Sequence, residues 1–176
     1  MDLLYTDYKY IVVKVYFGER KMKSYKKICL ISSTGGHFEQ IQQLKAVREK
    51  YNCYYVLPKS KVFLEMTQKK YLLGNVTRKT KIEYFFTYSR AFVQQFFVFL
   101  KEKPDIVITT GAGFAIPTSL YAHIFKKKLI YIESFARRES LNVTGKFLYK
   151  YADLFVVQWE ELLKYYPKAI YGGWIY

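Results

Sequence analysis

Short apolar runs alternate with longer amphipathic stretches along most of this chain. The short runs favour buried strands, whereas apolar repeats three and four residues apart favour helices. We expect strands over residues 28–31, 51–57, 82–86, 106–109, 128–132, 153–157 and 169–171. We expect helices from residue 39 onward and over residues 88–101, 114–125, 144–151 and 160–165, with Thr144 as a cap and a short helix and loop within 59–80.

The alternation of strands and helices predicts the α/β class. Most of the predicted strands are apolar throughout, which is typical of a parallel sheet with helices on both faces. At 176 residues the chain is long enough to bury one such core, and two cores are not expected.

Three loops that follow predicted strands carry most of the candidate chemistry. Residues 32–37 and 109–113 each contain two glycines in front of a predicted helix, and residues 133–138 contain charged side chains. A loop that leads into a helix presents backbone N–H groups that can hold a phosphate. Because ligands of parallel sheets bind beyond the carboxyl ends of the strands, we expect the three loops to converge on one cleft.

The charge balance bears on possible partners. Lys and Arg number 29 against 14 Asp and Glu, which gives a net charge of +15, and 20% of the residues are aromatic. This combination favours nucleic acid or an anionic membrane surface as a partner. The apolar surface of the helix over 88–101 is broader than one sheet face needs, so core packing, membrane contact and a protein partner all remain open. The lysines at 59, 61, 69, 70, 79, 81 and 126–128 are expected to be solvated or to face a membrane.

Neither a membrane span nor a signal peptide is recognisable in the sequence. Cys29 and Cys53 lie in apolar runs without Cys or His partners, so we expect free thiols, no metal site and no cofactor. Residues 1–24 show no clear period and are compatible with an interfacial anchor or with disorder. A natural start at Met22 would make residues 1–21 incidental.

Four segments resemble the amino-terminal half of a split, MurG-like glycosyltransferase. They are ISSTGGH at 31–37, DIVITTGAG at 105–113, YIES at 131–134 and YPKA at 166–169. Similar proteins are the PssD and CpsF type subunits of bacterial capsule and exopolysaccharide assembly, and the membrane-recruiting subunit of the eukaryotic dolichol-linked N-acetylglucosaminyltransferase. The resemblance covers residues 25–176 and implies a Rossmann-like domain equivalent to the N-terminal half of a GT-B glycosyltransferase.

The resemblance also implies a function. The chain would be the accessory subunit of a heterodimer, binding a polyprenyl-diphosphate-linked sugar acceptor at the cytoplasmic face of the cell membrane as a peripheral protein. A separate catalytic subunit would bind the UDP-sugar donor, so this chain alone would have little or no activity.

The resemblance gives roles to individual residues. His37 is either the base toward the acceptor hydroxyl or a hydrogen-bond donor to phosphate, and the phosphate role is favoured because a base must also reach the hydroxyl. Glu133 is a second catalytic candidate, but it could instead pair with Arg137 or Arg138. The candidate ligands of the acceptor phosphates are Thr34, Gly35, Gly36, Thr110, Gly111, Gly113, Arg137 and Arg138.

Three other functions compete with this interpretation. A dinucleotide-dependent oxidoreductase is disfavoured because the first loop is not Gly-x-Gly-x-x-Gly and Leu57-Pro58 stands where a ribose-binding carboxylate is needed. A nucleic-acid-binding module would explain the charge, but no RNP, KH or helix-turn-helix pattern is present, so we expect no nucleic acid. A purely structural scaffold would tolerate substitution of His37 and Glu133.

Overall fold

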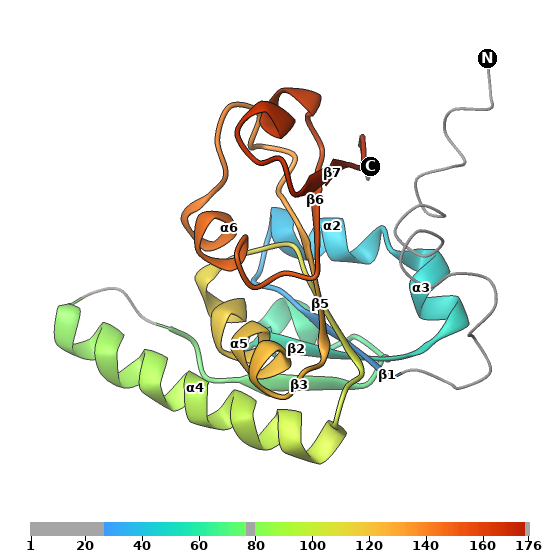
Figure 1. Ribbon diagram of the computed structural model, residues 1–176. Helices are drawn as coiled ribbons and strands as arrows, with labels where there is room; N and C mark the ends of the chain where they lie inside the picture. Colours follow the sequence, from blue (N-terminus) through green and yellow to red (C-terminus); the bar gives the residue numbers. More distant parts are fainter. Residues whose placement is uncertain (1–26, 77–79, 175–176) are drawn as a thin grey trace.

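The computed structural model describes residues 27–76 and 80–174, so the predictions for residues 1–24 lie outside the described part. Seven strands form one parallel sheet in the order β3-β2-β1-β4-β5-β6-β7 (Figure 1). They are β1 (Lys27–Ile31), β2 (Asn52–Pro58), β3 (Lys70–Leu73), β4 (Ile106–Thr109), β5 (Lys128–Ile132), β6 (Leu154–Val157) and β7 (Ala169–Tyr171). The chain builds outward from β1 to β3 and then returns to the other side of β1, so the strand order reverses between β1 and β4.

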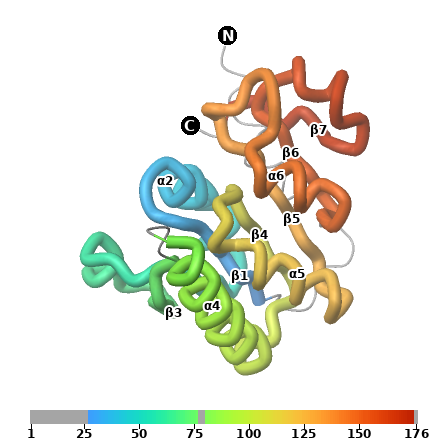
Figure 2. The backbone as a smooth tube through the Cα atoms, turned by 90° about the vertical axis from the view of Figure 1, so that its left-hand side faces the viewer, coloured from blue at the N-terminus to red at the C-terminus, as the bar shows by residue number. Residues whose placement is uncertain are grey.

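Helices cover both faces of the sheet. The α-helices are α2 (Gly36–Gln42), α3 (Lys45–Lys50), α4 (Lys81–Glu102), α5 (Ile116–Ile124) and α6 (Val143–Leu148), and the 3-10 turns are η1 (Lys61–Phe63), η2 (Gly113–Ala115) and η3 (Glu160–Lys164). Figure 2 shows α4 and α5 side by side in front of the strands.

Successive side chains along each strand point to opposite faces of the sheet, and this divides the core into layers. In β1, Ile28 and Leu30 pack with apolar side chains of α2 and α3. The residues between them in sequence point the other way: Cys29 and Ile31 pack with α4 and α5. A third cluster around Tyr131 and Phe155 lies under α6 and η3. The predicted α/β fold with a parallel sheet covered on both faces is therefore confirmed.

Three predictions of local structure were wrong: a strand over residues 82–86, a helix and loop where β3 lies, and the residue that caps α6. Residues 82–86 were expected to form a strand, but they belong to the first turns of α4. Thr80 accepts a hydrogen bond from the Glu83 N–H at 3.1 Å, and this Thr-x-x-Glu pair starts a helix despite the aromatic residues that follow. The edge strand β3 lies in the stretch expected to be helix and loop. Asn142, not Thr144, caps α6 by accepting from the Gly145 N–H at 2.7 Å.

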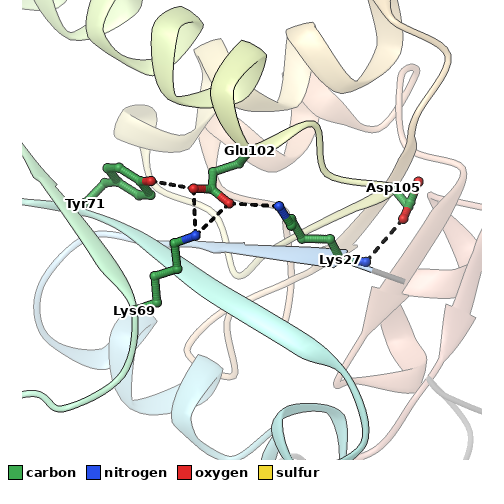
Figure 3. Close-up of polar contacts among 5 residues, drawn as sticks. All are labelled: Lys27, Lys69, Tyr71, Glu102 and Asp105. Carbon is green, nitrogen blue, oxygen red and sulfur yellow. Dashed lines mark hydrogen bonds and ion pairs between the residues drawn. The ribbon is translucent and has the colours of Figure 1, made fainter. Parts of the chain in front are cut away.

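A buried carboxylate ties the amino-terminal edge of the sheet together (Figure 3). Glu102, at the end of α4, is 3% exposed; its oxygens lie 3.1 Å from Lys27 Nζ and 2.8 Å from Lys69 Nζ, and it accepts a hydrogen bond from the Tyr71 hydroxyl. Burial favours the protonated acid, but the hydrogen bonds from Lys69, Tyr71 and Lys27 outweigh it and lower the pKa of Glu102 to about 2. Lys69 is thus part of an ion-pair network, and its side chain is also 54% exposed to solvent, in line with the expected solvated lysine.

Within the described residues, no helix combines the length and the apolar character needed to cross a membrane. Cys29 and Cys53 are free thiols, as expected.

Candidate functional site

The two glycine loops, residues 32–37 and 109–113, meet at the carboxyl edge of the sheet, where the strand order reverses. His37 Nδ1 lies 2.8 Å from the carbonyl oxygen of Thr110, and the Thr110 hydroxyl donates to the carbonyl of His37 at 2.7 Å. These reciprocal bonds join the loop after β1 to the loop after β4. The reversal point of an open parallel sheet is the usual position of its ligand site.

The hydrogen bond to Thr110 fixes the tautomer of His37. A carbonyl oxygen only accepts, so Nδ1 carries the hydrogen, and in the neutral ring Nε2 has the lone pair. Burial lowers the pKa of His37 below its usual 6.5, and it outweighs the opposing effect of the bond to Thr110. At neutral pH the ring is uncharged, and Nε2 accepts protons instead of donating them. This chemistry supports the role of a base over that of a phosphate donor.

Unusual backbone conformations shape both loops. Gly35 and Gly111 have φ values of 75° and 100°, which glycine adopts without strain. A Cβ on Gly111 would also lie 2.8 Å from the Tyr131 hydroxyl oxygen, so this position excludes other residues on steric grounds as well. Ala112 adopts φ 74° although it is not glycine, and such strained residues cluster at functional sites.

A cavity of about 610 Å³ opens beside these loops. Its walls are Ser33, Thr34 and His37 of the first loop, residues 112–114 of the second loop, residues 58–60 after β2, residues 75–76 after β3, and Tyr84 and Tyr88 of α4. The Tyr84 and Tyr88 rings stack with centroids 5.5 Å apart, and the Tyr88 hydroxyl donates to the Gly113 carbonyl at 3.3 Å. The cavity volume lies in the range of small-molecule sites.

The structure places the predicted phosphate ligands unequally around this cavity. Thr34 and Gly113 line it, and Gly35 and Gly36 lie in the same first loop with open space beside their α-carbons. Thr110 and Gly111 are outside the lining: the Thr110 hydroxyl joins the two loops through its bond to His37, and the Gly111 N–H donates to the Thr109 hydroxyl within its own loop. Neither Arg137 nor Arg138 lines the cavity: Arg138 donates to Glu161 at 3.1 and 3.2 Å, and its guanidinium lies over the Trp159 ring.

Sequence reasoning missed part of the cavity wall. Residues 58–60 directly follow a predicted strand, so the rule on carboxyl ends alone was sufficient to include Lys59 and Ser60. Tyr84 and Tyr88 were hidden by the incorrect strand over 82–86. Their spacing of four residues places them on one face of a helix once α4 is recognised.

Glu133 lies apart from the cavity lining. It is fully buried and accepts hydrogen bonds from the N–H of Ser134 at 2.7 Å, the N–H of Asn142 at 3.2 Å and the amide of Asn142 at 2.7 Å. Gly145 lies so close that a Cβ there would be 2.3 Å from a Glu133 oxygen. These contacts hold the loop between β5 and α6, and the two arginines make no hydrogen bond to Glu133.

Burial raises the pKa of Glu133 to about 7, although the N–H groups of Ser134 and Asn142 oppose the shift. The native state therefore binds a proton that the unfolded state releases near its ordinary pKa of 4.5. Stability from this group is present below pH 4.5 and is lost as the pH rises toward 7. We expect a loss of about 2 kcal/mol over this window in the wild type and none from this group in Glu133→Gln.

Urea unfolding at pH values from 4 to 8 measures this difference. Glu49→Gln is the matched control because Glu49 is an exposed carboxylate on α3. An unchanged pH dependence in Glu133→Gln would show that Glu133 does not hold a proton in the native state.

Comparison with known proteins identifies the family of this chain. The profile of the family described as "Oligosaccharide biosynthesis protein Alg14 like" matches residues 27–175. The "UDP-N-acetylglucosamine transferase subunit ALG14" of Mus musculus is 29% identical over 84% of this chain and 82% of the mouse protein. The protein of the same name from Kluyveromyces lactis is 40% identical over 42% of this chain and 34% of its own length.

Solved structures support the fold. MurG of Acinetobacter baumannii superposes with a TM-score of 0.65 at 14% identity, over 77% of this chain and 42% of that one. A UDP-N-acetylglucosamine 2-epimerase from Rickettsia bellii superposes with a TM-score of 0.67 at 17% identity, over 86% of this chain and 46% of that one. This chain therefore spans less than half of either protein, and the predicted Rossmann-like, GT-B-type fold is confirmed. From the profile match over residues 27–175, the chain belongs to the Alg14-like family of oligosaccharide biosynthesis proteins.

Proposed function

We propose that this chain is the acceptor-side subunit of a two-chain glycosyltransferase. It binds a polyprenyl-diphosphate-linked sugar and docks a catalytic subunit that binds the UDP-sugar, in the synthesis of a capsular polysaccharide or exopolysaccharide. The observation that carries the proposal is the cavity at the reversal point of the sheet, with the neutral His37 on its wall. The names of the relatives support the assembly, since they are subunits of a UDP-N-acetylglucosamine transferase.

In this proposal His37 acts as the general base. Nε2 removes the proton from the acceptor hydroxyl while the hydroxyl oxygen attacks the anomeric carbon of the donor sugar, and UDP leaves from the opposite face. The bond to Thr110 keeps the ring in the required tautomer. Glu133 positions the loop after β5 through Ser134 and Asn142 and does not contact substrate.

Transfer of radiolabelled sugar to a membrane lipid acceptor tests the proposal. UDP-N-acetylglucosamine is the first donor to try, because the relatives are named for it. The assay compares this chain, its candidate partner and both together. A rate for the pair far above either chain supports the two-chain enzyme, and full activity of this chain alone would contradict it.

The outer face of α4 supports peripheral membrane binding. Ile82, Phe86, Val93, Phe97 and Leu100 lie on one side of the helix, and 40 to 71% of each is exposed. Their spacing of three, four or seven residues makes a continuous apolar stripe, opposite the face that packs on the sheet. In Figure 1 this helix lies along the lower side of the molecule.

Two further exposed apolar residues lie at the end of α5, and lysines are close to both groups in the sequence. Ile124 and Phe125 are exposed there, and the Phe125 ring lies 5.5 Å from the ring of Phe99, a buried residue of α4. Lys101 and Lys103 stand at the end of α4, and three lysines at 126–128 directly follow Phe125. Apolar side chains together with lysine match the interface of an anionic bilayer, so we propose that α4 is the element that contacts the membrane.

Phe86→Ser combined with Phe97→Ser is expected to weaken partitioning onto anionic vesicles about tenfold or more, since each change removes a large apolar side chain from the interface. Vesicle sedimentation at increasing salt measures the partition constant. Tyr165→Ser is the matched control, because Tyr165 is an exposed aromatic residue near η3, away from α4. Equal loss in both variants would contradict a specific role for α4.

A further inference from the structure

Within residues 27–76 and 80–174, one residue with a full charge lines the cavity. The described lining includes serine, threonine, asparagine and tyrosine side chains, no carboxylate, and one ammonium group, that of Lys59. His37 adds no positive charge because burial keeps its ring neutral. The cavity is therefore suited to a ligand that combines hydroxyl groups with negative charge.

The pairing of β2 with β3 at the carboxyl edge of the sheet positions Lys59 at this wall. The Lys59 N–H donates to the Leu73 carbonyl at 2.7 Å, so the pairing of β2 with β3 continues one residue beyond Pro58. Lys59 therefore lies at the carboxyl edge of the sheet, next to the first glycine loop. Within residues 27–76 and 80–174 its ammonium group forms no ion pair, whereas Lys27, Lys69 and Lys128 each pair with a carboxylate.

Of the two arginines expected to neutralise a diphosphate, Arg137 lies close enough to His37 to lower the pKa of its ring, but it is outside the cavity lining. Arg138 is paired with Glu161 and lies over the Trp159 ring, and the cavity lining includes neither Arg137 nor Arg138. The positive charge that a diphosphate needs in this cavity is therefore available from Lys59.

We propose that Lys59 binds the diphosphate of the ligand in this cavity, with the hydroxyl groups of Ser33, Thr34 and Ser60 as further donors. An ammonium group with rotatable donors is a common phosphate ligand and forms charge-assisted hydrogen bonds. The inference rests on the proposed function, which supplies a diphosphate-linked substrate. Two compounds of the reaction carry a diphosphate, the lipid acceptor and the UDP-sugar, and the shared chemistry is the diphosphate ester.

Isothermal titration calorimetry on the full chain tests the inference, with inorganic pyrophosphate, a short-chain prenyl-diphosphate sugar and UDP-N-acetylglucosamine as separate probes. Lys59→Gln is expected to weaken pyrophosphate binding about tenfold or more, and Lys59→Arg to restore most of it. Lys61→Gln is the matched control, because Lys61 lies two residues further along in η1 and outside the cavity lining. The weakening in Lys59→Gln should shrink as salt rises.

The prenyl-diphosphate sugar and the UDP-sugar distinguish the two sources. A tenfold loss for the prenyl compound in Lys59→Gln, with little binding of the UDP-sugar to either protein, assigns the acceptor diphosphate to Lys59. A loss for the UDP-sugar alone assigns Lys59 to the donor diphosphate. Equal affinities of Lys59→Gln and the wild type, or no pyrophosphate binding by the wild type, would overturn the inference. The proposed function fails separately, if the two-chain assay shows no gain in transfer.

Discussion

Replacement of His37 by asparagine is expected to lower the rate of sugar transfer by the two-chain complex about 10²- to 10⁴-fold, the usual contribution of a general base. Asparagine keeps an N–H near the position of Nδ1, so the hydrogen bond to the Thr110 carbonyl and the contact between the two loops are retained. It has no basic nitrogen in place of Nε2. The measurement is kcat for transfer from radiolabelled UDP-sugar to lipid acceptor, with the partner chain in excess.

His123→Asn is the control, because His123 is the other of the two histidines and is exposed on α5. The pH profile adds a second readout. Burial lowers the pKa of His37 below 6.5, so the ring becomes protonated only in more acidic solution. The wild-type rate should therefore fall as the pH is lowered through that range. The acid limb should be absent in His37→Asn. A raised KM for the acceptor with kcat unchanged would instead assign His37 to phosphate binding.

Much of the fold could be predicted because local and global signals agree. The apolar run before Ser32 forms β1, and the Gly35-Gly36 pair forms the turn that leads into α2. The convergence of the two glycine loops follows from the parallel sheet alone, because β1 and β4 are neighbours and both loops start at the same edge of the sheet.

The rest of the site depends on where side chains point, and a sequence pattern does not give this. Glu133 and Arg138 follow the same strand, but Glu133 turns inward to the N–H groups of Asn142 and Ser134, and Arg138 turns outward to Glu161. Lys59 and Lys69 are equally basic in sequence. Lys69 pairs with Glu102, a residue 33 positions away, whereas Lys59 lines the cavity. Such partners are set by tertiary packing, which overrides local composition.

The opposite edge of the sheet gives the largest expected effect on stability. Glu102→Gln is expected to lower the free energy of unfolding by about 2–3 kcal/mol, because it removes the charge that binds Lys27 and Lys69. The usual cost of breaking a buried ion pair is higher, but the two lysine side chains are 33% and 54% exposed, and solvent screens them. Urea unfolding at pH 7 measures the loss, with Glu65→Gln, an exposed carboxylate, as the control.

The pH dependence separates lost charge from altered packing. The pKa of Glu102 is about 2 in the native state and 4.5 in the unfolded chain, so its stabilisation is present above pH 4.5 and is lost as the pH falls toward 2. The wild type and Glu102→Gln should therefore approach the same stability in acid. A difference that persists at low pH would mean that the glutamine disturbs packing around Tyr71. Because Glu102 lies at the amino-terminal edge and Lys59 at the carboxyl edge, folded Glu102→Gln should bind pyrophosphate like the wild type.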